Sequence, residues 1–269
     1  MRNLKTWCLP AVLSVLLCAC GEGKSGSGGN TGAGGDGGAA GGGGAPASGP
    51  EIRIDPATTG SIRGTVTFRG TPRTPGKNAA DADPVCHTMH PGGVVSESYV
   101  VGNNGALANI YVAVKGAPKG RYPAPGGTAL FDQAACVYVP HILAVQAGQK
   151  VEIRNSDDTA HNVHSLGKLN PEFNIAMPGK GSVFKTFESR EAIKFKCDIH
   201  GWMSAIIYVS DHPFFSVTGA DGSFSIAGVP AGEYELEATH EKMGTRTVKV
   251  RVEAGKEASA GFTFEEEGD

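Results

Sequence analysis

Short segments in which apolar and polar residues alternate are the feature that most limits the fold of this chain. Residues 151–154 read Val-Glu-Ile-Arg, and residues 248–253 read Val-Lys-Val-Arg-Val-Glu. A period of two places alternate side chains on opposite faces of a strand, whereas a helix needs apolar residues three and four positions apart. Gly and Pro clusters separate these segments, and no segment of helical period carries helix caps, apart from a turn near residues 78–83. The sequence therefore predicts an all-β protein built from antiparallel sandwiches.

The N-terminal residues are typical of a secretion signal. A basic start at Arg2 and Lys5 precedes a short apolar run, residues 9–19, which is too short to span a bilayer. The run ends in Leu-Cys-Ala-Cys-Gly, which resembles the lipobox of bacterial lipoproteins. The resemblance implies that residues 1–19 are a signal peptide and that Cys20 carries a lipid. Because Gly and not Asp follows Cys20, it also implies an outer-membrane anchor, on the periplasmic side of the envelope or at the cell surface. An ordinary secretion signal that contains cysteines is the alternative.

Residues 20–59 differ from the rest of the chain in composition. Gly, Ser, Ala and Pro dominate, and large apolar side chains are almost absent. Such a segment cannot bury enough apolar surface to offset the entropy lost on ordering, so we expect a disordered tether. Roughly 210 residues follow it, enough for one large or two modest domains. The formal net charge of −3 and the lack of any basic run argue against a nucleic-acid partner.

The strand pattern divides near residue 211. Residues 213–264 contain a strand, a turn with Asp221-Gly222, a second strand, and a further turn and strand after Val229. Asp-Gly suits the positive backbone angles of a tight hairpin. This spacing resembles the carboxypeptidase regulatory-like (transthyretin-like) β-sandwich, a module that commonly serves structure or interaction. We therefore expect one domain over residues 60–211 and a smaller sandwich with an acidic tail over residues 212–269.

Three residues with metal-binding side chains follow one another at intervals of three: Cys197, His200 and Met203. A thiolate, an imidazole and a weak thioether are what a mononuclear copper electron-transfer site needs, together with one more histidine. Ile193, Phe195 and Cys197 share one face of the preceding strand, so we expect the Cys197 sulfur to point inward. The loop that leaves this strand would carry a ligand histidine near the surface, where an electron can be transferred.

The further histidine lies upstream, in the segment Thr159–His164. A strand, a polar turn and His161-Asn162-Val163 resemble the first-ligand segment of cupredoxins such as plastocyanin, and Cys-x-x-His-x-x-Met resembles the ligand loop of amicyanin. The resemblance implies a Greek-key sandwich over residues 60–211, with an extended N-terminal part, in which Asn162 ties the two ligand segments together. It implies four ligands to one type 1 copper ion: His161, Cys197, His200 and the axial Met203. His164 is the chief rival ligand because it lies two residues from His161.

The remaining cysteines have other expected roles. Signal cleavage would remove Cys8 and Cys18, and lipidation would use Cys20. If copper holds Cys197, the last two cysteines are free to form a disulfide outside the cytoplasm. We therefore expect a disulfide between Cys86 and Cys136.

The segment around the first of these cysteines leaves two interpretations open. Cys86, His87, Met89 and His90 lie within five residues, between Pro84 and Pro91. Together they would form a second metal site, suited to Cu(I), or else a disulfide-anchored loop with surface histidines. His141 has no assigned role.

These resemblances together imply a blue-copper electron-transfer lipoprotein with redox proteins of the cell envelope as partners. No enzymatic activity is expected, because the chain has no second His-rich cluster of the kind that a multicopper oxidase or nitrite reductase needs. Two alternatives remain. One is a copper storage or delivery protein that uses the cluster around Cys86, and the other is a structural or adhesive β-sandwich protein that binds no metal.

Overall fold

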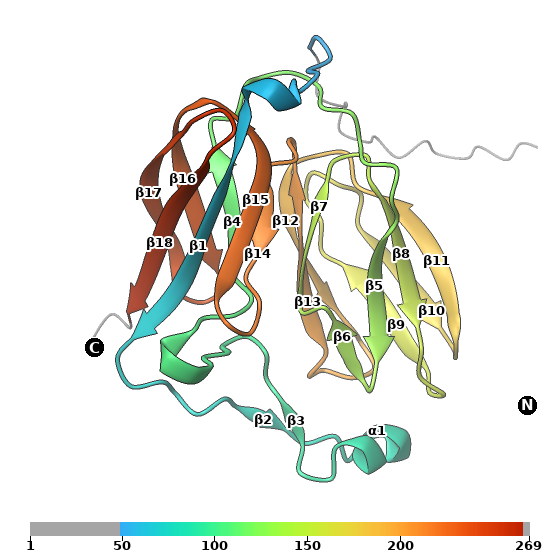
Figure 1. Ribbon diagram of the computed structural model, residues 1–269. Coiled ribbons are helices and arrows are strands. Elements are labelled where there is room, and N and C mark those ends of the chain that lie inside the picture. The colour runs from blue at the N-terminus through green and yellow to red at the C-terminus, as the bar shows by residue number, and fades with distance from the viewer. Residues whose placement is uncertain (1–48, 266–269) are drawn as a thin grey trace, which may run out of the picture. The chain divides into compact units, whose positions relative to one another are not determined.

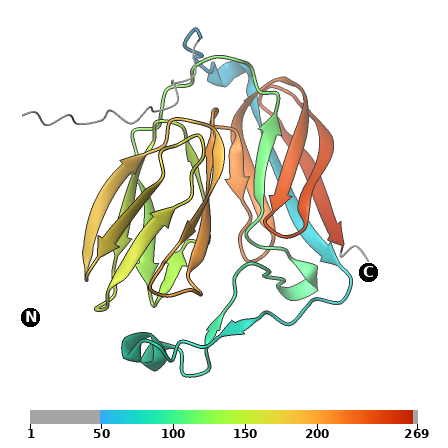
Figure 2. The same ribbon diagram turned by 180° about the vertical axis from the view of Figure 1, so that it is seen from behind.

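The computed structural model describes residues 49–265, and nearly all of their regular structure is β-strand (Figures 1 and 2). This confirms the predicted all-β class. The strands form two β-sandwiches, each with its own cluster of buried apolar side chains. The predicted signal peptide, the predicted lipidation site Cys20 and most of the predicted tether lie outside the described residues. Among residues 49–265, no helix is long and apolar enough to cross a membrane.

The first sandwich contains the predicted copper ligands. Its strands are β5 (Ala129–Ala134), β6 (Val137–Val139), β7 (Ile142–Gln146), β8 (Lys150–Asn155), β9 (His161–Ser165), β10 (Phe173–Met177), β11 (Gly181–Thr186), β12 (Glu191–Lys196) and β13 (Ser204–Ser210). One sheet has the strand order β10-β9-β12-β13-β7, and the other has the order β11-β8-β5-β6. The pairs β13–β7 and β5–β8 are parallel, and the other neighbours are antiparallel.

Alternation along the strands decides which side chains fill the core of this sandwich. On β12, Ile193 and Phe195 are buried, whereas the lysines between them are exposed. The Phe195 ring contacts three other aromatic rings, those of Phe131, Phe173 and Phe187, at centroid distances of 5.1–6.1 Å. Cys197, two residues after Phe195, continues this alternation and is buried in the same apolar cluster. The predicted inward direction of Cys197 is therefore confirmed.

The second sandwich combines strands from both ends of the described chain. These strands are β1 (Thr59–Arg69), β4 (Tyr111–Lys115), β14 (Phe215–Val217), β15 (Ser223–Pro230), β16 (Gly232–His240), β17 (Gly244–Val252) and β18 (Glu257–Glu265). One sheet has the order β15-β1-β18, and the other has the order β14-β4-β16-β17. Strand β1 runs antiparallel to β15 and parallel to β18.

Sheet membership differs from the predicted division at residue 211. Both β1 and β4 precede that residue, yet they pair with strands that follow it. The reason is the apolar face of β1, where Ile62 and Val66 are fully buried against Phe224 and Phe262 of the neighbouring strands. The first sandwich, from β5 to β13, thus lies in the sequence between strands of the second one.

The segment between β1 and β4 contains the one α-helix of the described chain. This helix, α1 (Pro84–Met89), begins after Asp83, whose side chain accepts hydrogen bonds from the backbone N–H groups of Val85 and Cys86. An Asp cap followed by Pro is a common helix start, which places the helix beyond the turn predicted at 78–83. Short strands β2 (Lys77–Asn78) and β3 (Val94–Val95) pair with each other, and 3-10 turns occupy Pro56–Thr58 and Asn103–Gly105. Figures 1 and 2 show α1 beneath one end of the first sandwich.

Candidate metal centre

Three of the four predicted ligands meet in the core of the first sandwich. His161 opens β9, Cys197 directly follows β12, and His200 lies on the loop that leads to β13. The Nδ1 atoms of His161 and His200 are 2.9 Å apart, and Cys197 Sγ lies 4.0 Å from Nδ1 of His200. All three side chains are buried, and their ligand atoms lie within 4.8 Å of one another.

These separations fit one metal ion bound by all three side chains. With metal–nitrogen bonds of about 2.0 Å, a metal–sulfur bond of about 2.3 Å and angles of roughly 100–120°, two nitrogens lie about 3.1–3.5 Å apart and a nitrogen and a sulfur about 3.3–3.7 Å apart. The observed values of 2.9 Å and 4.0 Å lie within about 0.3 Å of these ranges, so a small shift of the side chains brings all three ligand atoms to bonding distance. Two imidazoles and one thiolate are also the trigonal donor set of blue-copper sites.

Hydrogen bonds on the outer side of each ring determine which ring nitrogen can bind a metal. His161 Nε2 lies 2.9 Å from Asp157 Oδ2, and His200 Nε2 lies 3.3 Å from Asp83 Oδ2. A carboxylate accepts a hydrogen bond, so each Nε2 carries a proton and each Nδ1 can present a lone pair. Two such lone pairs repel each other at 2.9 Å unless a proton or a metal cation lies between them. The arrangement therefore favours a cation between the rings.

The acid–base equilibria of the three groups agree with this assignment. Burial raises the pKa of the Cys197 thiol, but hydrogen bonds from His161 and from the backbone N–H groups of Asn162 and His200 outweigh it and leave the pKa below its usual value. Burial lowers the pKa of His161, but its contacts with Cys197 and Asp157 raise it above the usual value. Burial, followed by the charge of His161, lowers the pKa of His200. The site thus favours a thiolate, which is the form of cysteine that binds metals.

Asn162 links the two ligand segments. Its backbone N–H lies 3.5 Å from Cys197 Sγ, its side-chain oxygen accepts from the backbone N–H of Asp198, and its side-chain nitrogen donates to Asp198 Oδ2 at 3.1 Å. The backbone N–H of His200 also points to Cys197 Sγ, at 3.4 Å. These bonds connect β9 to the loop after β12, so that the thiolate is held from both sides.

Met203 closes the ligand loop. Its backbone N–H donates to the carbonyl of His200 at 2.9 Å, and its carbonyl accepts from the N–H of Cys197 at 3.2 Å. The side chain is buried in the same apolar cluster as Cys197. The structure thus places Met203 in the core near Cys197, and its axial bond to a metal stays a prediction.

The expectation that a ligand histidine lies near the surface is wrong. His200 is only 1% exposed because Trp202 of the same loop and the helix α1 cover it. The Trp202 ring stacks on the imidazole with centroids 4.9 Å apart, and Cys86 Sγ of α1 lies 4.0 Å from Nε2. Asp83, at the start of α1, holds the same nitrogen. The loop sequence gives no sign of the contact with α1, because α1 lies more than 100 residues earlier.

The predicted disulfide is present in the structure. Cys86 and Cys136 are joined, with an S–S distance of 2.08 Å and a Cα–Cα distance of 5.7 Å. The bond connects α1 to the turn between β5 and β6, and Trp202 Nε1 donates to the Cys136 carbonyl at 3.0 Å. Cys136 N–H and Ala135 N–H both donate to Asp157, which therefore joins this turn to His161.

The other candidate residues around Cys86 do not gather into a site. His87 pairs with Asp81 at 2.9 Å, and His90 bonds the carbonyl of Ala135 at 2.7 Å. Met89 is largely exposed. The proposed ligand cluster of Cys86, His87, Met89 and His90 is therefore not assembled in this structure.

The two remaining histidines bind protein groups. His164 lies between Asp198 and Glu172, at 2.8 Å and 3.0 Å, and hydrogen bonds with these carboxylates raise its pKa. It is not among the three ligands that meet in the core. His141 bonds the carbonyl of Ser204 and the carboxylate of Glu241, and thereby connects the first sandwich to the turn between β16 and β17.

Sequence reasoning missed the two carboxylates behind the ligand rings. Asp157 lies four residues before His161 in the polar turn after β8, so its position in the sequence was a usable signal. Asp83 has no such signal for metal binding, since only the fold brings the start of α1 to His200.

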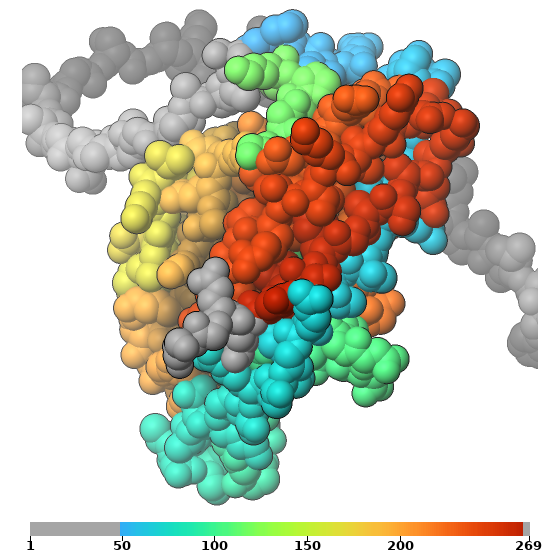
Figure 3. Space-filling view, turned by 90° about the vertical axis from the view of Figure 1, so that its left-hand side faces the viewer, coloured from blue at the N-terminus to red at the C-terminus, as the bar shows by residue number. Residues whose placement is uncertain are grey.

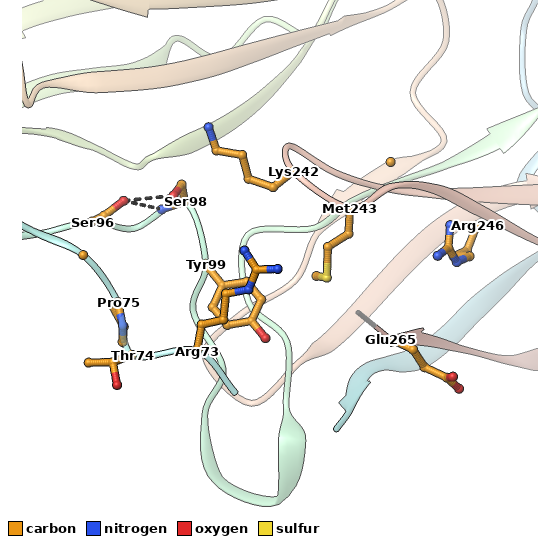
Figure 4. A pocket seen from close by; sticks show the side chains of 12 residues that line it. Arg73, Thr74, Pro75, Ser96, Ser98, Tyr99, Lys242, Met243, Arg246 and Glu265 are labelled. Carbon is orange, nitrogen blue, oxygen red and sulfur yellow. Dashed lines mark hydrogen bonds between the residues drawn. The ribbon is translucent and has the colours of Figure 1, made fainter. Parts of the chain in front are cut away.

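A hollow of about 660 Å³ lies elsewhere, where the segment after β1 meets the turn between β16 and β17. Figure 3 shows this segment in turquoise against the red strands of the second sandwich. Three cationic side chains, Arg73, Lys242 and Arg246, line the hollow, with Glu265 also on its wall (Figure 4). It shares no residue with the metal centre.

No curated protein matches the chain. The purple cupredoxin from Nitrosopumilus maritimus is 23% identical, over 30% of this chain and 99% of its own, with a TM-score of 0.27. Amicyanin from Paracoccus versutus is 19% identical, over 32% and 84%, with a TM-score of 0.29. The Cu-containing nitrite reductase from Thermus scotoductus SA-01 is 21% identical, over 36% and 25%, with a TM-score of 0.29.

A family model identifies the C-terminal part of the chain. The model of the carboxypeptidase regulatory-like domain matches residues 205–265. This range begins within β13 of the first sandwich, contains β14 to β18, and leaves out β1 and β4, which complete the two sheets of the second sandwich. The second sandwich therefore carries a carboxypeptidase regulatory-like domain.

Proposed function

We propose that this protein is a blue-copper electron-transfer lipoprotein with one type 1 copper ion, bound by His161, Cys197 and His200, with Met203 as the weak axial ligand. One observation carries the proposal. The Nδ1 atoms of both histidines and the sulfur of Cys197 converge at ligand distances in the buried core, while the outer nitrogen of each ring is held by a carboxylate. Copper bound there supplies one-electron oxidation and reduction.

The protein residues would keep the ligands in place while the metal changes its charge. Asp157 and Asp83 hold the outer nitrogens of the rings, and Asn162 holds the Cys197 loop. Such outer contacts orient ligands and tune the metal. Metal binding would also displace the proton that His161 shares at Nδ1, because the ligand form of histidine is neutral.

Electron transfer would use Trp202 as the contact with a docking partner. His200 itself is buried, but the indole that stacks on it is partly exposed. Under this proposal the partners are redox proteins on the periplasmic side of the envelope or at the cell surface, and the lipid on Cys20 anchors the protein in the outer membrane. No substrate is transformed.

The proposal is tested by the visible spectrum of the copper-loaded protein. The protein used is the full chain with Cys8, Cys18 and Cys20 replaced by Ser, named the three-serine chain below, because these cysteines lie outside the described residues and would bind copper themselves. Addition of Cu(II) should give one bound copper per chain and an intense thiolate-to-copper absorption band.

Two variants serve as controls for the spectrum. Cys197→Ser should abolish the band, whereas His164→Ala, which removes the rival histidine, should retain it. A colourless protein without bound copper would refute the proposal and favour a structural or adhesive role. If His164→Ala lost the band and His161→Ala retained it, His164 and not His161 would be the ligand, and the proposed ligand set would be wrong.

A further inference from the structure

The Cys86–Cys136 disulfide lies against the outer edges of both ligand histidines. On one side, Asp83, Cys86 and His200 offer ligand atoms that lie within 4.8 Å of one another. On the other side, Cys136, Asp157 and His161 form a second group with the same spacing. Each sulfur of the disulfide therefore lies next to one carboxylate and one imidazole.

These two groups are enclosed in the protein. Both cysteines are fully buried, and Asp157 is 5% exposed. Trp202 packs against the small apolar cluster around the disulfide and bonds the Cys136 carbonyl.

Reduction of the disulfide would allow both sulfur atoms to bind a metal. A sulfur in a disulfide is not a thiolate ligand. A partner dithiol would transfer two electrons and two protons to the Cys86–Cys136 bond, forming two thiols here and a disulfide in the partner. On binding a metal, the two thiols would lose their protons, and a pair of thiolates is a donor set that selects soft ions.

We propose that the dithiol form of this protein has a second metal site, in which Cys86 and Cys136 bind a soft cation such as Cu(I) beside Asp83 and Asp157. The site differs from the inner centre, which uses the Nδ1 atoms of the histidines and Cys197. It goes beyond the proposed electron-transfer function and does not require the inner thiolate. Its occupancy depends on whether the disulfide is reduced.

The test uses the three-serine chain with Cys197→Ser, so that the inner thiolate is absent. One sample keeps the disulfide and the other is reduced with a water-soluble phosphine, which is then removed without air. Both are titrated with Cu(I) in competition with a coloured Cu(I) chelator. The reduced sample should take up one Cu(I) per chain at least about ten-fold more tightly than the oxidised sample.

A matched control removes the two outer sulfurs. Cys86→Ala with Cys136→Ala in the same background should show no gain after phosphine treatment. If that chain fails to fold, alkylation of the two thiols in the reduced Cys197→Ser chain makes the same comparison. Equal Cu(I) affinity of the reduced and oxidised samples, or an undiminished gain after alkylation, would overturn the proposal.

The outcome is separate from that of the copper spectrum. Absence of the absorption band in the oxidised chain would contradict the proposed inner ligands and would leave the outer site untouched. The gain in Cu(I) affinity when the Cys197→Ser chain is reduced depends on the outer sulfurs alone, because the inner histidines and Met203 are present in both samples.

Discussion

Gly64 on β1 offers a test of which sandwich this strand belongs to. Gly64 is paired with Phe224 of β15 on one side and Ala260 of β18 on the other. A Cβ atom added to Gly64 would lie 1.7 Å from the carbonyl oxygen of Ala260 and 2.7 Å from the Phe224 ring. Since such contacts essentially never fall below 3.0 Å, the substitution Gly64→Ala must push β18 away by more than an ångström.

The expected cost follows from what this shift disrupts. It breaks backbone hydrogen bonds of the β1–β18 pair, each worth about 1 kcal/mol. It also disturbs the buried Phe224 and Phe262 rings, and such overpacking costs about 1–3 kcal/mol. We therefore expect Gly64→Ala to lower the free energy of unfolding by about 3 kcal/mol, which lowers the melting temperature by roughly 15 °C for a sandwich of this size.

The assay is thermal unfolding of the full chain followed by far-UV circular dichroism. Gly261→Ala on β18 is the matched control, because the nearest atom to its added Cβ is the Thr65 carbonyl oxygen at 3.7 Å, an ordinary contact. This control should change stability by no more than about 0.5 kcal/mol. Equal melting temperatures for the two variants would refute the placement of β1 between β15 and β18.

Three further predictions concern the first sandwich. Phe195→Ala should destabilise it by about 3–5 kcal/mol in chemical unfolding, because the ring is buried among three aromatic side chains; a loss below about 1 kcal/mol would contradict the packing. Burial opposes ionisation of Glu191, but hydrogen bonds from Asn170 and the backbone N–H groups of Lys168 and Leu169 outweigh it and hold the pKa of Glu191 below its usual value. Its contribution to stability is therefore complete above the pKa of an unfolded glutamate and is lost as the pH falls through the lower folded value, so unfolding measured against pH should show an acid-sensitive part that Glu191→Gln lacks. Asn162→Ala should weaken copper binding by roughly 10- to 100-fold in chelator competition while the absorption band persists; an unchanged affinity would show that the loop needs no such link.

The local sequence was sufficient for the β-strands, and its resemblance to cupredoxin motifs pointed to the three side chains that meet in the core. Alternation with a period of two predicted that Cys197 points into the core on the same side as Phe195, because side chains two residues apart in a strand lie on the same face. Cys197 and His200 lie at the two ends of one short turn, so a local reversal of the chain is enough to bring their side chains together. Once Cys197 was assigned to the metal, Cys86 and Cys136 were the remaining pair, and this count predicted the bond between them.

Only the tertiary structure decided what surrounds these elements. The pairing of β1 with β18, the cover of α1 over His200, and the position of the disulfide beside both rings each join residues 50 to more than 190 positions apart. The alternating pattern of a strand states which face is buried but not which distant strand will bury it. Short-range pattern therefore determined the strands and the candidate ligand motif, whereas long-range burial of apolar faces determined how the domains divide and how the candidate metal centre is enclosed.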